Sequence, residues 1–155
     1  MEKKLGISYY NKAEEYRNTV NLLVSSDIYN SSVTVLNELA MECYMSSVIE
    51  LAKNKSMEQI YGRGLIPHDL FGLYNDMYNA DKDMRYLGDF DRTIRQELKS
   101  AFKDYNASRF PKDQSYVVIN EETIKFNVSL MEDIRELAEE YINSYNRNLK
   151  TPQKN

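Results

Sequence analysis

Breaks in regular structure are rare in this chain, which has only five glycines and three prolines among its 155 residues. Between these breaks, apolar residues recur every three or four positions, which is the period of a helix with one buried face. The pattern predicts helices over residues 7–24, 28–53, 68–78, 89–107 and 121–146. The sequence therefore predicts an all-α protein, folded as an up-and-down bundle of about five helices.

Polar residues predict where several of these helices begin. The Ser-Ser-Asp sequence at 25–27 ends the first helix and offers an N-cap for the second. Ser56 and Gln59 have the spacing of a capping box, which predicts one short turn between the second and third helices. Asn120 is a favourable N-cap for the last helix, and Glu121 follows it near the positive end of the helix dipole.

Length and composition predict one domain, residues 1–148, followed by a polar and disordered tail at 149–155. The single cysteine, Cys43, permits no disulfide within the chain. It lies on the apolar stripe of the second helix, which we expect to bury one side and to hold an unreactive thiol. The chain has no apolar signal segment and no run long enough to span a membrane, so we expect a cytoplasmic protein without membrane contact.

The charge pattern contains one coherent basic surface. The net charge of −4 disfavours non-specific binding of nucleic acids by the chain as a whole. Four cations of the fourth helix nevertheless fall within an arc of about 80° opposite its apolar stripe: Arg92, Arg95, Lys99 and Lys103. One interpretation is a face that contacts phosphate or RNA, and the other is a solvated face balanced by Glu97 and Asp104.

Three short motifs occur in order along the chain. Ala40-Met41-Glu42 lies in the second helix, His68-Asp69-Leu70 at the start of the third, and an aromatic-rich run ends the fourth. The residues that carry the pattern are Glu42, His68, Asp69, Tyr105, Arg109 and Pro111. Their order and spacing resemble the HEPN domain family (higher eukaryotes and prokaryotes nucleotide-binding), across roughly residues 5–148.

The resemblance implies a prokaryotic helical module that forms a homodimer. Family members often accompany a nucleotidyltransferase in toxin–antitoxin or defence systems, so it implies a non-catalytic module that binds a nucleotide or such a partner protein. RNA is a further candidate partner, and an interaction scaffold without a small ligand is a third interpretation. No cofactor is expected, and one histidine with one cysteine argues against a zinc site.

Two family positions are altered here. Phe110 stands where a tyrosine is usual, and Ser46 replaces a usual lysine, which removes one cation from any phosphate site. Arg109 has two open roles, because a guanidinium binds phosphate in a bidentate manner or pairs with a buried carboxylate. On the family pattern, Glu42 is the candidate carboxylate for that pair across the bundle.

A ribonuclease is the enzymatic alternative. HEPN ribonucleases carry an arginine followed, after four to six residues, by a histidine, and Arg63 and His68 fit this spacing. The arginine would stabilise charge on the phosphorane while the histidine moves a proton. Gly62, Gly64 and Pro67 favour a loop here instead of a helix, so the competing interpretation is that His68 and its neighbour cap the third helix.

Overall fold

The computed structural model describes residues 4–62, 69–82, 84, 93–99, 101 and 120–150, with side chains as far as 148. Within these ranges the chain is helical and contains no strand. The helices are α1 (Ile7–Ser25), α2 (Ser31–Lys53), α3 (Met57–Tyr61), α4 (Leu70–Ala80) and α6 (Glu121–Lys150), and residues 93–99 are also helical. The prediction of an all-α bundle is confirmed.

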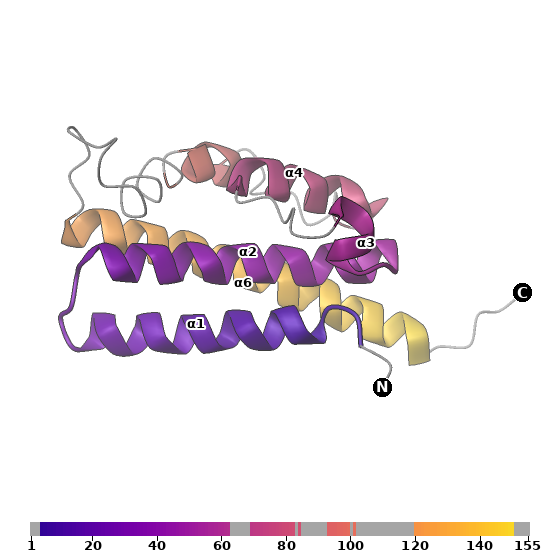
Figure 1. Cartoon of the computed structure of the whole chain (residues 1–155), viewed down its shortest axis with the longest axis horizontal. Coiled ribbons are helices and arrows are strands. Elements are labelled where there is room, and N and C mark those ends of the chain that lie inside the picture. The colour runs from indigo at the N-terminus through magenta and orange to yellow at the C-terminus, as the bar shows by residue number, and fades with distance from the viewer. Residues whose placement is uncertain are drawn as a thin grey trace, which may run out of the picture.

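The helix α2 lies at the centre of the arrangement (Figure 1). It has α1 on one side, α3 and α4 on the other, and α6 behind it, and it contacts all four. The helix α1 runs antiparallel to α2, whereas α6 runs in the same direction as α2. No described helix combines the length and the apolar composition that a membrane crossing requires.

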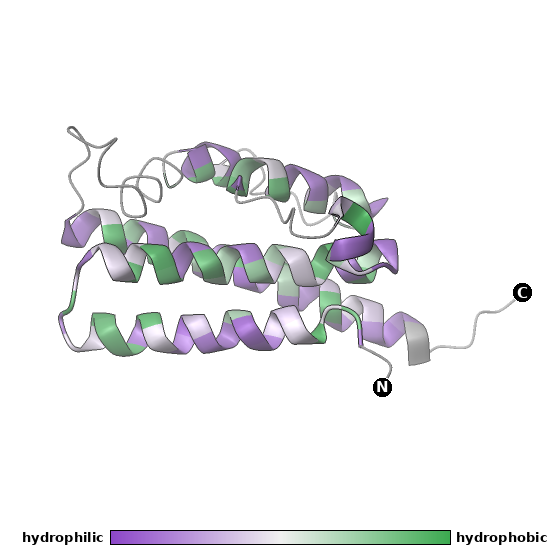
Figure 2. Ribbon diagram, viewed as in Figure 1, coloured by the Kyte–Doolittle hydropathy of each residue, from purple (hydrophilic) through white to green (hydrophobic). Residues whose placement is uncertain are grey.

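The central position of α2 overturns the expectation that it buries one side. Every residue from Val33 to Glu50 is buried or half-buried, and Figure 2 shows hydrophobic residues along its whole length. Cys43, on the predicted stripe, is only half-buried, whereas Met41 and Met45 are fully buried. A helix that is packed on several sides has no single buried stripe, which is why the periodicity was misleading here.

The start of α2 also differs from the prediction. The N-cap is Asn30, whose side-chain oxygen accepts hydrogen bonds from the backbone N–H groups of Ser32 and Val33. The predicted cap at residues 25–27 is wrong: Ser26 is the C-cap of α1, and Asp27 adopts a left-handed backbone with φ of 58°. The polar sequence at 25–27 therefore ends one helix without starting the next.

The other predicted caps that lie within the described residues are confirmed. Ser56 and Gln59 form the reciprocal capping box at the start of α3. Asp69 caps α4 by accepting the N–H of Phe71. The side chain of Asn120 accepts the N–H of Thr123 at 2.9 Å.

The last helix is longer than predicted. Instead of ending near residue 146, α6 continues to Lys150. The remaining residues of the predicted tail, 151–155, lie outside the described part of the chain, as do the C-terminal residues of the predicted fourth helix.

Candidate functional site

A row of paired polar side chains joins α1 to α6. Glu14 of α1 accepts hydrogen bonds from Arg135 Nε of α6 at 2.8 Å and from the hydroxyl of Tyr44 at 2.7 Å. Burial by itself would raise the pKa of Glu14, but the hydrogen bonds from Arg135 and Tyr44 outweigh it, so the pKa is lowered. Burial and the bond to Glu14 raise the pKa of the Tyr44 phenol, which stays protonated at neutral pH.

Two further pairs extend the row in both directions. The Tyr10 hydroxyl donates to Glu139 at 2.6 Å, and Arg17 Nε donates to Glu132 at 2.7 Å. The three contact residues of α1 are separated by four and then three positions. Their partners in α6 have the same separations in the reverse order along the chain, as expected for antiparallel helices. These side chains hold one another, and we interpret the row as structural.

This row was not predicted from the sequence. Its signal is the matched spacing of charged or phenolic residues, at 10, 14 and 17 in α1 and at 132, 135 and 139 in α6. Each residue lies beside the apolar stripe of its own helix, where long side chains reach a neighbouring helix while keeping their charges near water.

A buried carboxylate ties three elements together at the end of α2. Glu50 is 1% exposed, and it accepts the backbone N–H of Gly6 at 3.0 Å and that of Met57 at 2.8 Å. These two N–H groups precede α1 and open α3, where helix geometry leaves amides without partners inside the helix. Glu50 therefore anchors the start of the described chain and the start of α3 to the central helix.

Two more acidic residues of α2 are buried. Glu38 is completely buried and Glu42 is 5% exposed. The predicted pairing of Glu42 with Arg109 stays a prediction, because Arg109 lies outside the described residues. Glu38, Glu42 and Glu50 are separated by multiples of four residues, so they follow one side of α2. That spacing in a largely apolar helix was the signal that sequence reasoning missed for Glu38 and Glu50.

The cysteine of α2 lies in an environment that disfavours its thiolate form. Burial, and to a smaller extent the charge of Glu42, raises the pKa of the Cys43 thiol to about 12. The thiolate is the nucleophilic form, so the raised pKa supports the predicted lack of reactivity, which stays a prediction.

Two members of the predicted basic stripe lie over aromatic rings of α4. The guanidinium carbon of Arg95 is 5.1 Å from the ring centroid of Tyr78 and 5.2 Å from that of Tyr74. The Lys99 ammonium is 4.9 Å from the ring centroid of Phe71. We call this surface the cationic–aromatic face; its residues are Phe71, Tyr74, Tyr78, Arg95 and Lys99.

The position of Arg95 is fixed by several contacts. Its Nη1 donates to the side-chain oxygen of Asn75 at 3.0 Å, and Phe71 provides a third ring at 5.8 Å. The rings of Tyr74 and Tyr78 are stacked with centroids 6.3 Å apart. Arg95 is half-buried against aromatic rings, whereas Lys99 is exposed, and both interpretations of the stripe stay predictions.

The remaining predicted site residues lie outside the described part of the chain. They are the ribonuclease pair Arg63 and His68, the stripe members Arg92 and Lys103, and the motif residues Tyr105, Arg109 and Pro111. Of the motif residues within it, Asp69 has the predicted capping role and Glu42 is buried. The described Cys, Asp and Glu side chains form no group of three that would hold a metal ion.

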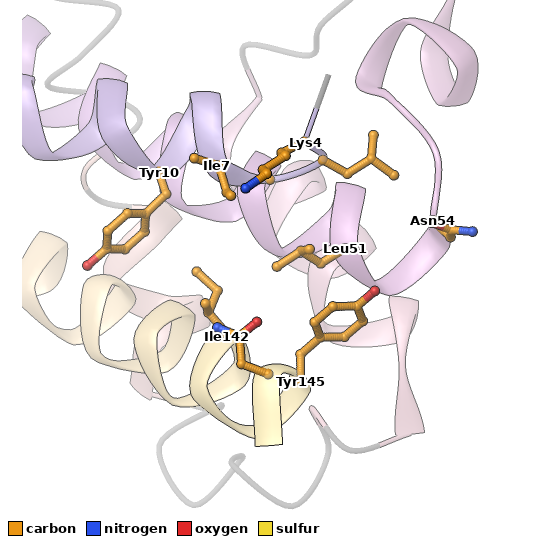
Figure 3. Close-up of a pocket in the computed structure, with 10 residues that line it drawn as sticks. Lys4, Ile7, Tyr10, Leu51, Asn54, Ile142 and Tyr145 are labelled. Atoms are coloured by element: carbon orange, nitrogen blue, oxygen red, sulfur yellow. The ribbon is translucent and has the colours of Figure 1, made fainter. Parts of the chain in front are cut away.

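A pocket opens where the start of α1 meets the ends of α2 and α6. Its volume is about 760 Å³. Figure 3 shows Ile142 and Tyr145 of α6 on one side of it, with Ile7 and Leu51 on the other. None of these residues was predicted as a site from the sequence, because they come from three segments far apart in the chain.

Comparisons with known proteins do not assign this architecture to a family. No family model, curated protein or solved structure matches the chain. A function for this chain therefore has to be inferred from its own residues and their geometry.

Proposed function

We propose that this chain is a non-catalytic, HEPN-like module that binds a nucleotide through its cationic–aromatic face. The observation that carries the proposal is the placement of Arg95 and Lys99 over the rings of α4. The face combines the two groups that nucleotide recognition uses, cations for phosphates and aromatic rings for bases. Homodimerisation, and partnership with a nucleotidyltransferase or RNA, belong to the same proposal as expectations from the HEPN resemblance.

The geometry favours phosphate binding by Arg95 in particular. A guanidinium that is already held by rings and by Asn75 loses little conformational freedom when it binds an anion. Lys99 lies four residues away on the same side of its helix, so both cations can approach one phosphate chain. Phe71 and Tyr78 are half-buried, which leaves part of each ring accessible for contact with a base.

A thermal-shift titration with ATP, ADP, AMP and GTP tests this proposal. A nucleotide at 100 times its dissociation constant adds about 2.7 kcal/mol, or roughly 5–10 °C for a chain of this size. We expect a saturable shift that decreases with added salt, because the contacts are ionic. Lys99→Ala should weaken nucleotide binding about fivefold, equivalent to about 1 kcal/mol.

A matched control separates ligand binding from the general effect of losing a cation. Lys12 also lies over an aromatic ring, that of Tyr16 at 5.2 Å, but on α1. Lys12→Ala should leave the nucleotide shift unchanged. The absence of a shift with all four nucleotides, or an equal loss in the Lys12 and Lys99 variants, would overturn the proposal.

A further inference from the structure

We propose that the pocket between the start of α1 and the ends of α2 and α6 binds a small apolar molecule that carries one anionic group. This site shares no residue with the cationic–aromatic face. Its volume of about 760 Å³ lies within the roughly 300–1,000 Å³ that is usual for small-molecule sites. The proposal is independent of nucleotide binding.

The walls of the pocket suit an apolar body. Aliphatic side chains come from all three segments, with Leu5 and Ile7 at the start, Leu51 in α2 and Ile142 in α6. Tyr145 adds an aromatic ring on the α6 side (Figure 3). A hydrocarbon chain or a ring system placed here would remove apolar surface from water on several sides.

Ile7 supports this assignment because of its exposure. Its side chain borders the pocket, yet the residue is 48% exposed, which makes it one of the few large apolar residues of the described chain that face water. A ligand in the pocket would cover Ile7. Removing this apolar surface from water would add favourable free energy to binding.

The polar groups of the pocket favour an anion. Lys4 is the one ionised side chain among the described residues that line it, and Asn54 and Asn146 add amide groups. Figure 3 shows the Lys4 ammonium beside Ile7 at the edge of the cavity. Lys4 is exposed at this edge, so its ammonium can pair with a carboxylate or a phosphate monoester on a ligand whose apolar part lies in the pocket.

The two carboxylates that accept hydrogen bonds from lining residues, Glu50 and Glu139, also have other partners. Glu50 is buried and accepts the N–H groups of Gly6 and Met57. Glu139 accepts the Tyr10 hydroxyl and also pairs with Arg135 at 2.8 Å. Among the described residues that line the pocket, none is a carboxylate that would pair with Lys4.

The backbone gives the pocket a fixed shape before any ligand arrives. Gly6 has a φ of 77°, a positive backbone angle that residues other than glycine rarely adopt. A Cβ atom on Gly6 would lie 2.7 Å from Cγ of Leu51 and 2.9 Å from the backbone oxygen of Ser47. The start of the described chain is thus pressed against α2 by contacts that only glycine permits, and this wall is preorganised.

Calorimetric titration with three probes that each carry a ten-carbon chain tests the proposal: decanoate, decyl phosphate and decyltrimethylammonium. We expect saturable binding of at least one of the two anions and at least fivefold weaker binding of the cation. The tighter anion identifies the head group. Lys4→Gln should weaken the affinity for the anion that binds about fivefold. Lys12→Gln removes the same charge elsewhere on the surface and should leave this affinity unchanged.

A second pair of variants tests the apolar wall. Ile7→Ser should weaken anion binding about tenfold because it removes apolar contact area. Leu22→Ser is the matched control, since Leu22 lies on the same helix, is 66% exposed and does not line the pocket. Ile7 is exposed, so we expect both variants to remain folded.

Mapping on the unaltered protein keeps the test independent of folding. Methyl resonances of Ile7, Leu51 and Ile142 should shift in the NMR spectrum when the bound anion is added. The proposal is overturned if neither anion binds, if the cation binds equally well, or if the shifted methyl groups lie away from the pocket. It is also overturned if Lys4→Gln and Ile7→Ser both leave the affinity unchanged.

Discussion

The two longest helices of this protein, α6 and α2, differ in which of their residues are buried. The 30-residue α6 buries residues at intervals of three and four along one side, and its charged residues remain at the edges or in water. The 23-residue α2 is buried or half-buried at every position from Val33 to Glu50. A helix at the surface of a bundle keeps its amphipathic period, whereas a helix at the centre loses it.

The same contrast governs their charged residues. In α2 the carboxylates of Glu38 and Glu50 lie in the interior, and that of Glu50 is held by backbone N–H groups. In α6 the charges of Arg135 and Glu139 lie beside the apolar stripe and pair with side chains of α1. Removing a charge should therefore be costly in α2, moderate at the α1–α6 seam, and without effect on the open surface.

The largest effect is expected for Glu50→Ala. The substitution removes a carboxylate that satisfies the N–H groups of Gly6 and Met57, and it leaves both buried amides without their acceptor. We expect the free energy of unfolding to fall by about 3 kcal/mol, as measured by urea denaturation. Glu50→Gln retains one acceptor oxygen and should cost less.

Glu136→Ala in α6 is the matched control for this prediction. Glu136 is exposed, so its loss should change the free energy of unfolding by less than about 0.5 kcal/mol. Equal effects of the two alanine variants would contradict the contrast between the helices.

An intermediate effect is expected for Glu14→Gln at the α1–α6 seam. The side chain of Glu14 is 25% exposed and that of Arg135 is 21% exposed, so water weakens their pairing only in part. We expect a loss of about 1 kcal/mol at neutral pH. In Arg135→Met the further loss from Glu14→Gln should be smaller, and additive losses would show that the two residues do not interact.

Lowering the pH tests the contact between Glu14 and Arg135 without a substitution. The pKa of Glu14 in the folded protein lies below its ordinary value of 4.5. Its contribution to stability is therefore fully present above that value and is lost as the pH falls through the folded pKa. The difference in the free energy of unfolding between the unaltered protein and Glu14→Gln should shrink below pH 4.5, and a constant difference would contradict this assignment.

The smallest effect is expected for Lys125→Ala on the surface of α6. Lys125 pairs with Glu121 at 2.7 Å, but both side chains are more than half exposed. Side-chain entropy and salt screening offset most of such an attraction. We expect no measurable change in the melting temperature, and a clear loss would show that this exposed pair contributes more than its geometry suggests.

Local signals predicted the ends of the helices unevenly. The capping box of Ser56 and the cap at Asn120 were correct because the acceptor and the donors of such caps lie within three residues of each other. The start of α2 was wrong because residues 25–27 and Asn30 both have capping side chains. Which one caps the helix depends on where the turn places α2 against α1, and that information is not local.

The candidate sites depend on tertiary packing even more than the ends of the helices do. Arg95 and Lys99 were identified from their spacing, but their contact with Phe71, Tyr74 and Tyr78 depends on how two helices pack. The pocket and the role of Glu50 were not predicted at all. Each joins residues separated by 40 positions or more, such as Gly6 and Glu50, which are 44 positions apart.

The sequence by itself determined that this chain is helical, because helix periodicity, capping and the scarcity of glycine and proline act over a few neighbouring residues. Only the tertiary structure decided that α2 is central, that its glutamates are interior, and that α1, α2 and α6 leave a pocket between their ends. Helix packing depends on the shape and burial of whole surfaces, and those surfaces exist only after the helices have come together.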